Sequence, residues 1–385
     1  MLGLLMSRRS HMERIEIVKK QSKSKEHHWV PQIYLKSWAV GATIYEFNNK
    51  GIKVAKKCNI SNILCNKHLY SKKAEDSYIL NEDNLDQMIA ENLSALDITC
   101  GEKKLKSWKD YCDYIGSFDK WIVKKGGKII GRKHKQKVGH IITYWYDPEI
   151  EDLLANKIDD NWKLILGYLN DKILTSKTIT KKEEYKKEIA QYVVVQYFRT
   201  PFHKKLIRSV DETFNIFKSS IKGNGIEEQI DIMKRCHWLK NLEMFLENME
   251  GEGQKEYNYI KQVYELTLKG KFTFFVDYKA NFITSDSPVV VIVDDTWVNG
   301  IYMTLTPQIM LFISNNTKEV EPGHYNIIDI NRGCVARLNK LIVDNSHSKV
   351  YFYRDNVKGI VSKEMSKTTY LKYVNEKLSK RGICI

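Results

Sequence analysis

Proline is scarce in this chain, and long apolar runs are missing. Only six of the 385 residues are proline, so each one marks a place where a helix or strand ends or turns. No run approaches the roughly 18 apolar residues that a membrane-spanning helix needs, and the most apolar stretch, 289–293, has the length of a strand. The apolar start, 1–6, is too short for a signal peptide and precedes its basic residues. These absences predict a soluble, cytoplasmic chain with no membrane partner.

Familiar site motifs are absent as well. The seven cysteines are scattered without a CxxC pair, which is typical of reduced thiols rather than of a disulfide framework. Cys58, Cys65 and His68 lie close in sequence, but they lack a fourth ligand and the paired spacing of structural zinc sites. There is no Walker A loop, no GxGxxG after a strand, no HExxH and no GxSxG, which disfavours P-loop, zinc-peptidase and α/β-hydrolase chemistry. No nucleotide-cofactor motif occurs, and a divalent metal stays open.

Positive charge is abundant. The chain has 62 Lys and Arg against 47 Asp and Glu, a formal net charge of +15, with 43% hydrophobic residues. This composition predicts a globular chain, and its charge favours an anionic partner such as nucleic acid. Residues 121–137 contain no acidic residue and are typical of a basic loop or hairpin. Their candidate nucleic-acid-binding residues are Lys124, Lys125, Lys128, Arg132, Lys133, Lys135 and Lys137.

Hydrophobic periodicity divides the chain into a helical middle and a strand-rich end. Apolar residues at helical spacing predict helices at 84–97, 147–174, 182–198, 202–222, 227–249, 255–269 and 363–380. Other apolar runs predict a hairpin of 43–47 with 52–54, and strands at 272–276, 282–284, 289–293, 301–305, 309–313 and 349–353. Segregated helices and strands predict an α+β fold, with a central helical bundle packed on a mainly antiparallel C-terminal sheet and an N-terminal strand and hairpin segment.

Three short motifs hold the candidate catalytic residues. His27 and His28 titrate near neutrality, so they either pass protons and hold a metal or pack in the core. Arg199 precedes a proline that ends a helix, where its guanidinium either complements the helix dipole or binds phosphate or a carboxylate. Asp286 lies in a loop between two strands, where it either forms an Asx turn or acts at a site on a rigid scaffold.

The order of these motifs along the chain carries a resemblance. They are His27-His28-x-x-Pro31-x-x-Tyr34-Leu35, His68-Leu69-Tyr70, Arg199-Thr200-Pro201, Thr284-Ser285-Asp286-x-Pro288-Val289, Leu305-Thr306-Pro307 and Asn331. In this order they resemble a widespread, mostly bacterial family named only as domain of unknown function 4238. The resemblance covers about 27 to 353, and it implies one compact unit in which the motifs meet, with no established reaction.

The expected domain boundaries follow from this resemblance and the periodicity together. Residues 1–26 are expected to form a flexible basic arm and 357–385 a C-terminal helix. Between them, 27–356 forms a single family domain. Its parts are an N-terminal α/β part at 27–100, a basic insertion at 101–146, the helical bundle at 147–270 and the sheet part at 271–356.

Convergence of the motifs would place a proton carrier, an anion clamp and a carboxylate in one cleft. Such a set suits phosphodiester cleavage, with a histidine as general base, Asp286 orienting it or holding a metal, and Arg199 stabilising the developing charge. The basic segment would hold the phosphate backbone, and four aromatic residues would be available to stack on bases. These are Trp121, Tyr144, Trp145 and Tyr146.

The resemblance therefore favours a nuclease or nucleotide-modifying effector in bacterial conflict or antiphage defence. A non-catalytic module that binds nucleic acid or protein is the alternative, in which Arg199 pairs with Asp286 and the histidines belong to the core. A third interpretation, an enzyme acting on small phosphorylated metabolites, leaves the basic segment without a role. Whether the chain is an enzyme stays open on the sequence alone.

Overall fold

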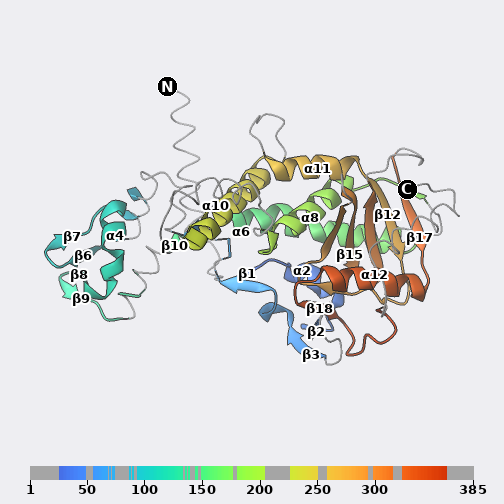
Figure 1. Ribbon diagram of the computed structural model, residues 1–385, viewed down its shortest axis with the longest axis horizontal. Coiled ribbons are helices and arrows are strands. Elements are labelled where there is room, and N and C mark those ends of the chain that lie inside the picture. The colour runs from blue at the N-terminus through green and yellow to red at the C-terminus, as the bar shows by residue number, and fades with distance from the viewer. Residues whose placement is uncertain are drawn as a thin grey trace, which may run out of the picture. The chain divides into compact units, whose positions relative to one another are not determined.

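The computed structural model divides the chain into two compact units (Figure 1). Unit 1 is drawn from 1–27 and 66–151, and unit 2 from 28–65 and 152–385. The chain passes from one unit to the other within β1 (Glu26–His28), β4 (Cys65–Lys67) and α6 (Glu149–Leu153). The structure describes residues 26–48, 55–67, 69–70, 72–73, 86–87, 89–90, 93–132, 135–136, 138, 144–145, 149–176, 180–203, 226–249, 258–293, 298–314 and 323–361.

Unit 2 is built on a six-stranded sheet with the order β11-β17-β12-β16-β15-β14. Neighbouring strands are antiparallel except β12 and β17, which run parallel. Every residue of β16 is buried, as a continuous apolar run predicts for a strand covered on both faces. The strands are β11 (Thr180–Lys182), β12 (Lys271–Val276), β14 (Val289–Val293), β15 (Val298–Thr306), β16 (Ile309–Ser314) and β17 (His324–Asp329).

A second sheet of unit 2 joins its N-terminal hairpin to the end of the described chain. Its order is β13-β18-β2-β3. The strands are β2 (Thr43–Asn48), β3 (Lys56–Asn59), β13 (Thr284–Ser285) and β18 (Lys349–Phe352). Short helical turns precede and follow the hairpin, and they are α2 (Gln32–Leu35), η1 (Lys36–Trp38) and η2 (Ile60–Asn62). Pro31 stands at the N-cap of α2, where its missing N–H costs nothing.

The side chains of α8 are buried on nearly every face. This helix contacts α11, η5 and β14, while α12 packs on β14 and β18. Two π-helical segments, η5 and η6, flank α7, and such segments often occur at functional sites. The bounds are η5 (Leu154–Asp159), α7 (Asp160–Tyr168), η6 (Leu169–Ile173), α8 (Lys186–Phe198), α10 (Ile226–Glu247), α11 (Tyr259–Lys269) and α12 (Arg332–Asn345).

Unit 1 has a sheet and a core of its own. The sheet order is β7-β6-β8-β9, and its inner face packs with Trp108 and Tyr111 of the following helix into one apolar cluster. The β8–β9 hairpin turns at Gly126 and Gly127, whose positive φ angles of 54° and 79° suit a two-residue hairpin turn. The elements are β6 (Leu96–Cys100), β7 (Lys103–Lys104), α4 (Trp108–Tyr114), η4 (Ile115–Lys120), β8 (Trp121–Lys125) and β9 (Lys128–Ile129), with β5 (Lys72–Lys73) pairing β10 (Tyr144–Trp145).

The structure confirms the α+β fold class and corrects several boundaries. The helix expected over 84–97 ends earlier, because 96–100 form β6 with Ile98 and Cys100 facing the core. The return strand expected at 52–54 lies outside the described residues, and the strand that pairs with β2 is β3 at 56–59. The sequence pattern missed both β17 and α12. Most of the arm expected at 1–26, of the helix expected at 202–222 and of the C-terminal helix expected at 357–385 lies outside the described residues, and the described 357–361 form no α-helix.

Among the helices that the structure describes, none has both the length and the apolar character to cross a membrane.

Two glycines of unit 2 make a matched test of this packing. A Cβ on Gly300 of β15 would lie 2.4 Å from Cε2 of Phe312, whereas one on Gly167 of α7 would meet nothing within 4 Å. We expect Gly300→Ala to lower the free energy of unfolding by about 2 kcal/mol through overpacking. Gly167→Ala should raise it by up to about 1 kcal/mol through helix propensity. Urea unfolding followed by circular dichroism measures both, and equal midpoints for the two variants would contradict this packing.

Candidate functional site

Arg199 is buried at the C-terminal end of α8, with 1% of its surface exposed. Its Nη1 donates to Oδ1 of Asp159 at 2.8 Å, and its Nη2 donates to the backbone carbonyl of His28 at 2.9 Å. Pro201 stops the helix at this point because it cannot continue the hydrogen-bond ladder. The guanidinium therefore joins three segments of unit 2, namely the N-terminal segment, η5 and α8.

The buried polar cluster around this pair contains Asp159, Trp162, Tyr192, Gln196 and Arg199. Gln196 donates to the carbonyl of Trp29 at 2.8 Å, and the rings of Tyr192 and Trp162 stack with their centroids 4.0 Å apart. Burial raises the pKa of the Asp159 carboxyl, and the nearby Arg199 charge acts in the opposite direction. Burial likewise raises the pKa of the Tyr192 hydroxyl well above its usual value, with the Asp159 charge adding to the effect.

Three polar atoms of this cluster are buried without a hydrogen-bond partner in the described part of the chain. They are the Tyr192 hydroxyl, the Trp162 indole nitrogen and the side-chain oxygen of Gln196. An unpaired buried polar group costs about 1–3 kcal/mol. These three atoms therefore lower the stability of unit 2 at the point where the motifs meet. Sequence reasoning found Arg199 but missed its companions. Residues 192, 196 and 199 recur at spacings of four and three, which places them on one face of the helix, and this spacing was the available signal.

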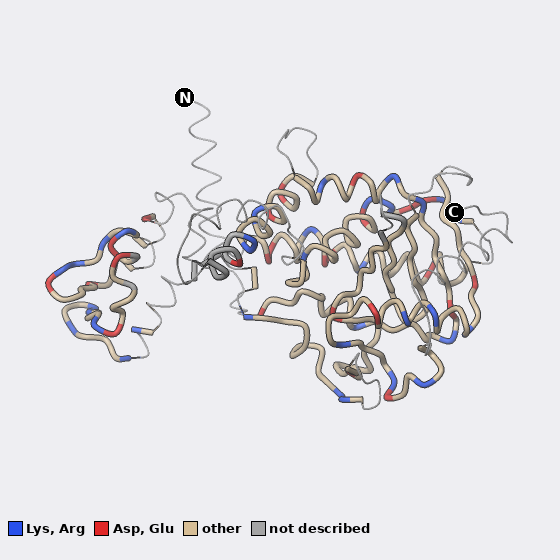
Figure 2. The backbone as a smooth tube through the Cα atoms, in the orientation of Figure 1, with Lys and Arg blue, Asp and Glu red and all other residues tan. Residues whose placement is uncertain are grey.

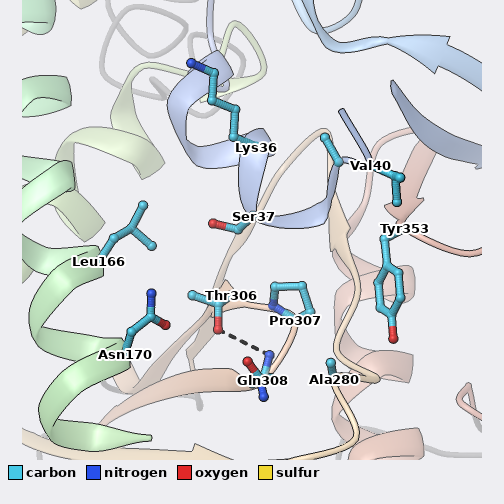
Figure 3. A pocket seen from close by; sticks show the side chains of 11 residues that line it. Lys36, Ser37, Val40, Leu166, Asn170, Ala280, Thr306, Pro307, Gln308 and Tyr353 are labelled. Carbon is cyan, nitrogen blue, oxygen red and sulfur yellow. Dashed lines mark hydrogen bonds between the residues drawn. The ribbon is translucent and has the colours of Figure 1, made fainter. Parts of the chain in front are cut away.

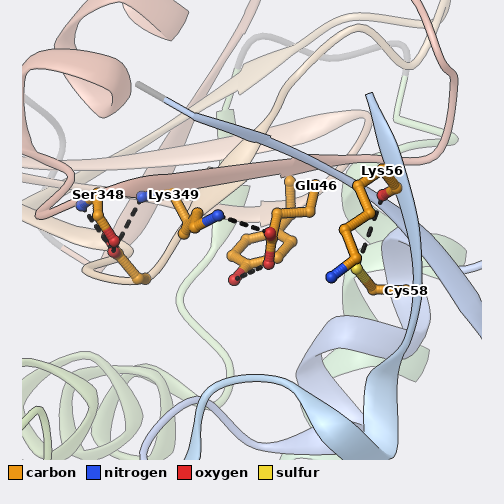
Figure 4. Close-up of polar contacts among 7 residues, drawn as sticks. Glu46, Lys56, Cys58, Ser348 and Lys349 are labelled. Atoms are coloured by element: carbon orange, nitrogen blue, oxygen red, sulfur yellow. Dashed lines mark hydrogen bonds and ion pairs between the residues drawn. The ribbon is translucent and has the colours of Figure 1, made fainter. Parts of the chain in front are cut away.

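Asp286 binds backbone amides rather than a side-chain cation. Its carboxylate accepts from the N–H groups of His347, Ser348 and Lys349 at 2.8, 2.8 and 3.0 Å. The Lys349 ammonium instead meets Oε1 of Glu46 at 2.7 Å (Figure 4). The carboxylate thus fixes the start of β18 beside β13. These contacts are structural, but they do not form the expected Asx turn, because the amides lie 61 to 63 positions further along the chain.

The two histidines lie in different units. In unit 2, Gln32 Nε2 lies 2.9 Å from Nε2 of His28, and His28 Nδ1 lies 3.1 Å from the carbonyl of Ile63. Donation by Gln32 leaves the imidazole proton on Nδ1, where it meets that carbonyl. In unit 1, His27 is buried, and its Nδ1 accepts from the N–H of Tyr70 at 3.1 Å.

The segments holding Trp29, Arg199 and Asp286 do converge in unit 2. The Trp29 indole donates to the carbonyl of Asp286 at 3.1 Å, and its ring meets Phe202 edge-on. Phe202 in turn stacks on His347 with centroids 4.0 Å apart. The carboxylate that pairs with Arg199 is Asp159, so the expected Arg199–Asp286 ion pair is wrong. Contacts between the motifs are mostly through backbone groups and aromatic rings.

Two further expectations meet the structure less well. Trp121 is only 2% exposed and donates to the carbonyl of Tyr114, so the expectation that it stacks on bases is wrong because it belongs to the unit 1 core. Among the described residues, no group of three or more His, Cys, Asp and Glu is placed to hold a metal ion. His68, Lys133, Lys137 and Tyr146 lie outside those residues, as do the side chains of Tyr144 and Trp145.

His203 lies in an aromatic cage at the end of the same motif segment. Its ring meets Phe198 and Tyr197 edge-on and stacks beside Tyr259. Burial lowers the pKa of His203 to about 4. The imidazole is therefore neutral at physiological pH, and in this cage it contributes packing rather than charge.

The comparisons with known proteins agree with the motif order. The family model described as "Protein of unknown function (DUF4238)" matches residues 26–356, which is most of the chain. The chain therefore belongs to this family. No curated protein and no solved structure matches it.

The Arg199–Asp159 pair predicts a large loss of stability on truncation. We expect Arg199→Met to lower the free energy of unfolding by about 3 kcal/mol, because it leaves a partly buried carboxylate and a backbone carbonyl unpaired. The control is Lys163→Met, which breaks the exposed 3.0 Å pair with Asp160 and should cost under about 0.5 kcal/mol. Chemical unfolding measures both, and equal losses would show that Arg199 is not a structural residue.

His203 predicts a pH dependence of stability. Its folded pKa of about 4 lies below the ordinary 6.5, so the unfolded chain takes up a proton first as the pH falls. The His203 contribution is complete above pH 6.5 and is lost towards pH 4, by about 3 kcal/mol. We expect His203→Phe, and His203→Gln as a polar alternative, to flatten this part of the profile in unfolding experiments from pH 8 to 4. Slopes identical to wild type in both variants would contradict the buried, neutral histidine.

Proposed function

We propose that this DUF4238 family member binds nucleic acid through the β8–β9 hairpin of unit 1, and that His28, Arg199 and Asp286 of unit 2 act structurally. One observation supports the proposal most strongly. Lys125, Lys128 and Arg132 are exposed on or next to this hairpin, and in the described part of the chain none of them forms an ion pair. Basic residues, drawn blue, recur along the part of the backbone where Figure 1 labels β8 and β9 (Figure 2). Cations held on a rigid ribbon without acidic partners are suited to phosphate.

The outer face of the sheet adds apolar surface beside Lys124. Ile122 is 42% exposed and Ile129 is 70% exposed, and Lys124 lies directly opposite Ile129 across the hairpin. Lys104 is on the same face, where it pairs with Asp97. A two-stranded ribbon of this kind fits the major groove of duplex DNA, and its isoleucines would contact sugars or bases.

The basic residues of 121–137 are not all available to bind nucleic acid. Lys135 donates to the carbonyl of Asp119 at 2.7 Å and lies over the Phe118 ring, so its ammonium is already used inside unit 1. The interface that we propose therefore consists of Lys124, Lys125, Lys128 and Arg132. Lys133 and Lys137 remain sequence-based predictions.

Catalysis by His27, His28, Arg199 and Asp286 also remains a prediction. Arg199 and Asp286 each have strong protein partners, which supports the structural interpretation over a nuclease. Phosphodiester cleavage would need these groups to exchange those partners for substrate. Cytoplasmic localisation and a role in antiphage defence likewise stay predictions, drawn from composition and from the family's bacterial distribution.

Nucleic-acid binding should depend on salt through the hairpin. We expect the full chain to bind a fluorescein-labelled 30-mer with an affinity that falls steeply from 50 to 200 mM salt. Because each phosphate contact contributes about 0.9 to the logarithmic slope on duplex DNA, replacing Lys124, Lys125 and Lys128 by Gln should lower the slope by roughly 2 to 3. The control replaces three exposed lysines of unit 2, Lys57, Lys172 and Lys187, by Gln.

Equal slopes for the two triple variants would contradict the assignment of the interface to the hairpin. The same mixtures, analysed on denaturing gels with Mg²⁺, Mn²⁺ or chelator, separate binding from cleavage. Intact RNA and DNA are expected. Cleavage by wild type that Asp286→Ala abolishes at unchanged thermal stability would replace our proposal with the nuclease.

A further inference from the structure

Unit 2 contains a cavity of about 570 Å³ that none of the roles above uses. Its walls come from η1, from α7 and η6, from the turn between β15 and β16, and from the residue after β18. Figure 3 shows Leu166 and Asn170 on one side, Val40 and Tyr353 on the other, and Thr306 and Pro307 between them. The volume lies within the roughly 300–1,000 Å³ typical of small-molecule sites. Thr306 and Pro307 belong to one of the motifs that carry the family resemblance.

The turn at the base of the cavity is held rigidly. The Thr306 hydroxyl accepts from the N–H groups of Gln308 and Ile309 at 3.2 and 3.1 Å. The carbonyl of Pro307 accepts from Phe282, and that of Gln308 accepts from Asp277. A β-bulge between Thr304 and Thr306 lies directly before the turn, and bulges often occur beside sites because they redirect side chains. The polar wall is therefore preorganised.

Three polar side chains around this turn have no protein partner. The Ser37 hydroxyl and the side-chain amides of Asn170 and Gln308 line the cavity, and none of them forms a hydrogen bond with another described residue. Asn170 is presented by the π-helical segment η6. Hydroxyl and amide groups that converge unpaired on a cavity supply donors and acceptors for a polar ligand.

The other part of the lining is apolar and aromatic. Pro307, Ala280 and Val40 line it together with Tyr353. Phe352 and the Arg354 guanidinium both pack against the Tyr353 ring, at 4.6 Å between ring centroids and 4.7 Å from the guanidinium carbon to the ring centroid. An aromatic ring supported in this way and facing a proline suits a flat, apolar group such as a base.

The positive charge of the lining favours an anionic ligand. Lys36 is the one charged side chain among the described lining residues, and no carboxylate is present there. We propose that this cavity binds a nucleoside monophosphate. The base lies between Pro307 and Tyr353, the ribose meets Ser37, Asn170 and Gln308, and Lys36 at the rim binds the phosphate. This site lies wholly in unit 2, so it stands independently of the nucleic-acid interface in unit 1.

Calorimetric titration of the full chain tests the proposal with four probes. These are adenosine 5′-monophosphate, uridine 5′-monophosphate, ribose 5-phosphate and inorganic phosphate. We expect saturable one-to-one binding of at least one nucleotide, and binding of ribose 5-phosphate roughly tenfold weaker because it lacks the stacked base. Ribose 5-phosphate binding as tightly as both nucleotides, or binding of inorganic phosphate alone, would overturn the assignment, as would no binding of either nucleotide.

Substitutions of the lining residues test whether the nucleotide binds in this cavity. Asn170→Leu should weaken binding about fivefold by removing a hydrogen bond, and Tyr353→Leu should weaken it roughly tenfold. Lys36→Met should weaken nucleotide binding, while Lys57→Met, an exposed lysine of β3 outside the cavity, should leave it unchanged. Thermal unfolding of each variant identifies losses caused by misfolding. Nucleotide affinity unchanged in both Asn170→Leu and Lys36→Met, with both folded, would overturn the proposal.

Discussion

The burial of one guanidinium sets the arrangement of unit 2. Transfer of Arg199 from water into the core is costly unless the buried charge is paired and hydrogen-bonded. Asp159 of η5 pairs with the guanidinium, and the carbonyl of His28 in the N-terminal segment accepts a hydrogen bond from it. Three segments far apart in sequence must therefore meet at the end of α8. The motifs around His28 and Arg199 are parts of one packing arrangement, and this explains their joint presence without requiring a shared reaction.

The Asp286 carboxylate organises a second part of unit 2. Asp286 gathers three successive backbone amides at the start of β18, and its own carbonyl holds the indole of Trp29. Both charged residues thus use strong, charge-assisted hydrogen bonds to position backbone. The motifs around His28, Arg199 and Asp286 hold the segments of unit 2 together, whereas the hairpin cations that we propose to bind nucleic acid lie in unit 1.

Part of the fold could be predicted from the sequence, because the helices of 149–173, 226–247 and 259–269 have apolar residues at helical spacing and strands β2, β12, β14, β15, β16 and β18 contain apolar runs. The contacts of the candidate site were harder to predict from the sequence. Asp159 pairs with a residue 40 positions away. Asp286 accepts hydrogen bonds from backbone amides, which every residue except proline has, so the residue types give no signal of these contacts. Trp121 was misjudged, although its alternation with Val123 matches an inward-facing strand pattern. α12 depends on Asn331, whose side chain caps it by accepting from the N–H of Cys334, and a single polar residue is a weak signal.

The π-helical segments have a consequence for how this chain tolerates changes of length. A π turn holds one residue more than an α turn, so η5 acts as an insertion that the helix has absorbed without breaking. Deleting one residue there would restore regular α-helical pitch and leave the helix beyond it in register, whereas deleting one residue from the regular turns at the start of α7 would rotate everything beyond the deletion by about 100°. Trp162 and the rest of α7 would then leave their places against α8, although no contact residue had been replaced. In this helix the residue count, as much as residue identity, keeps the polar cluster assembled.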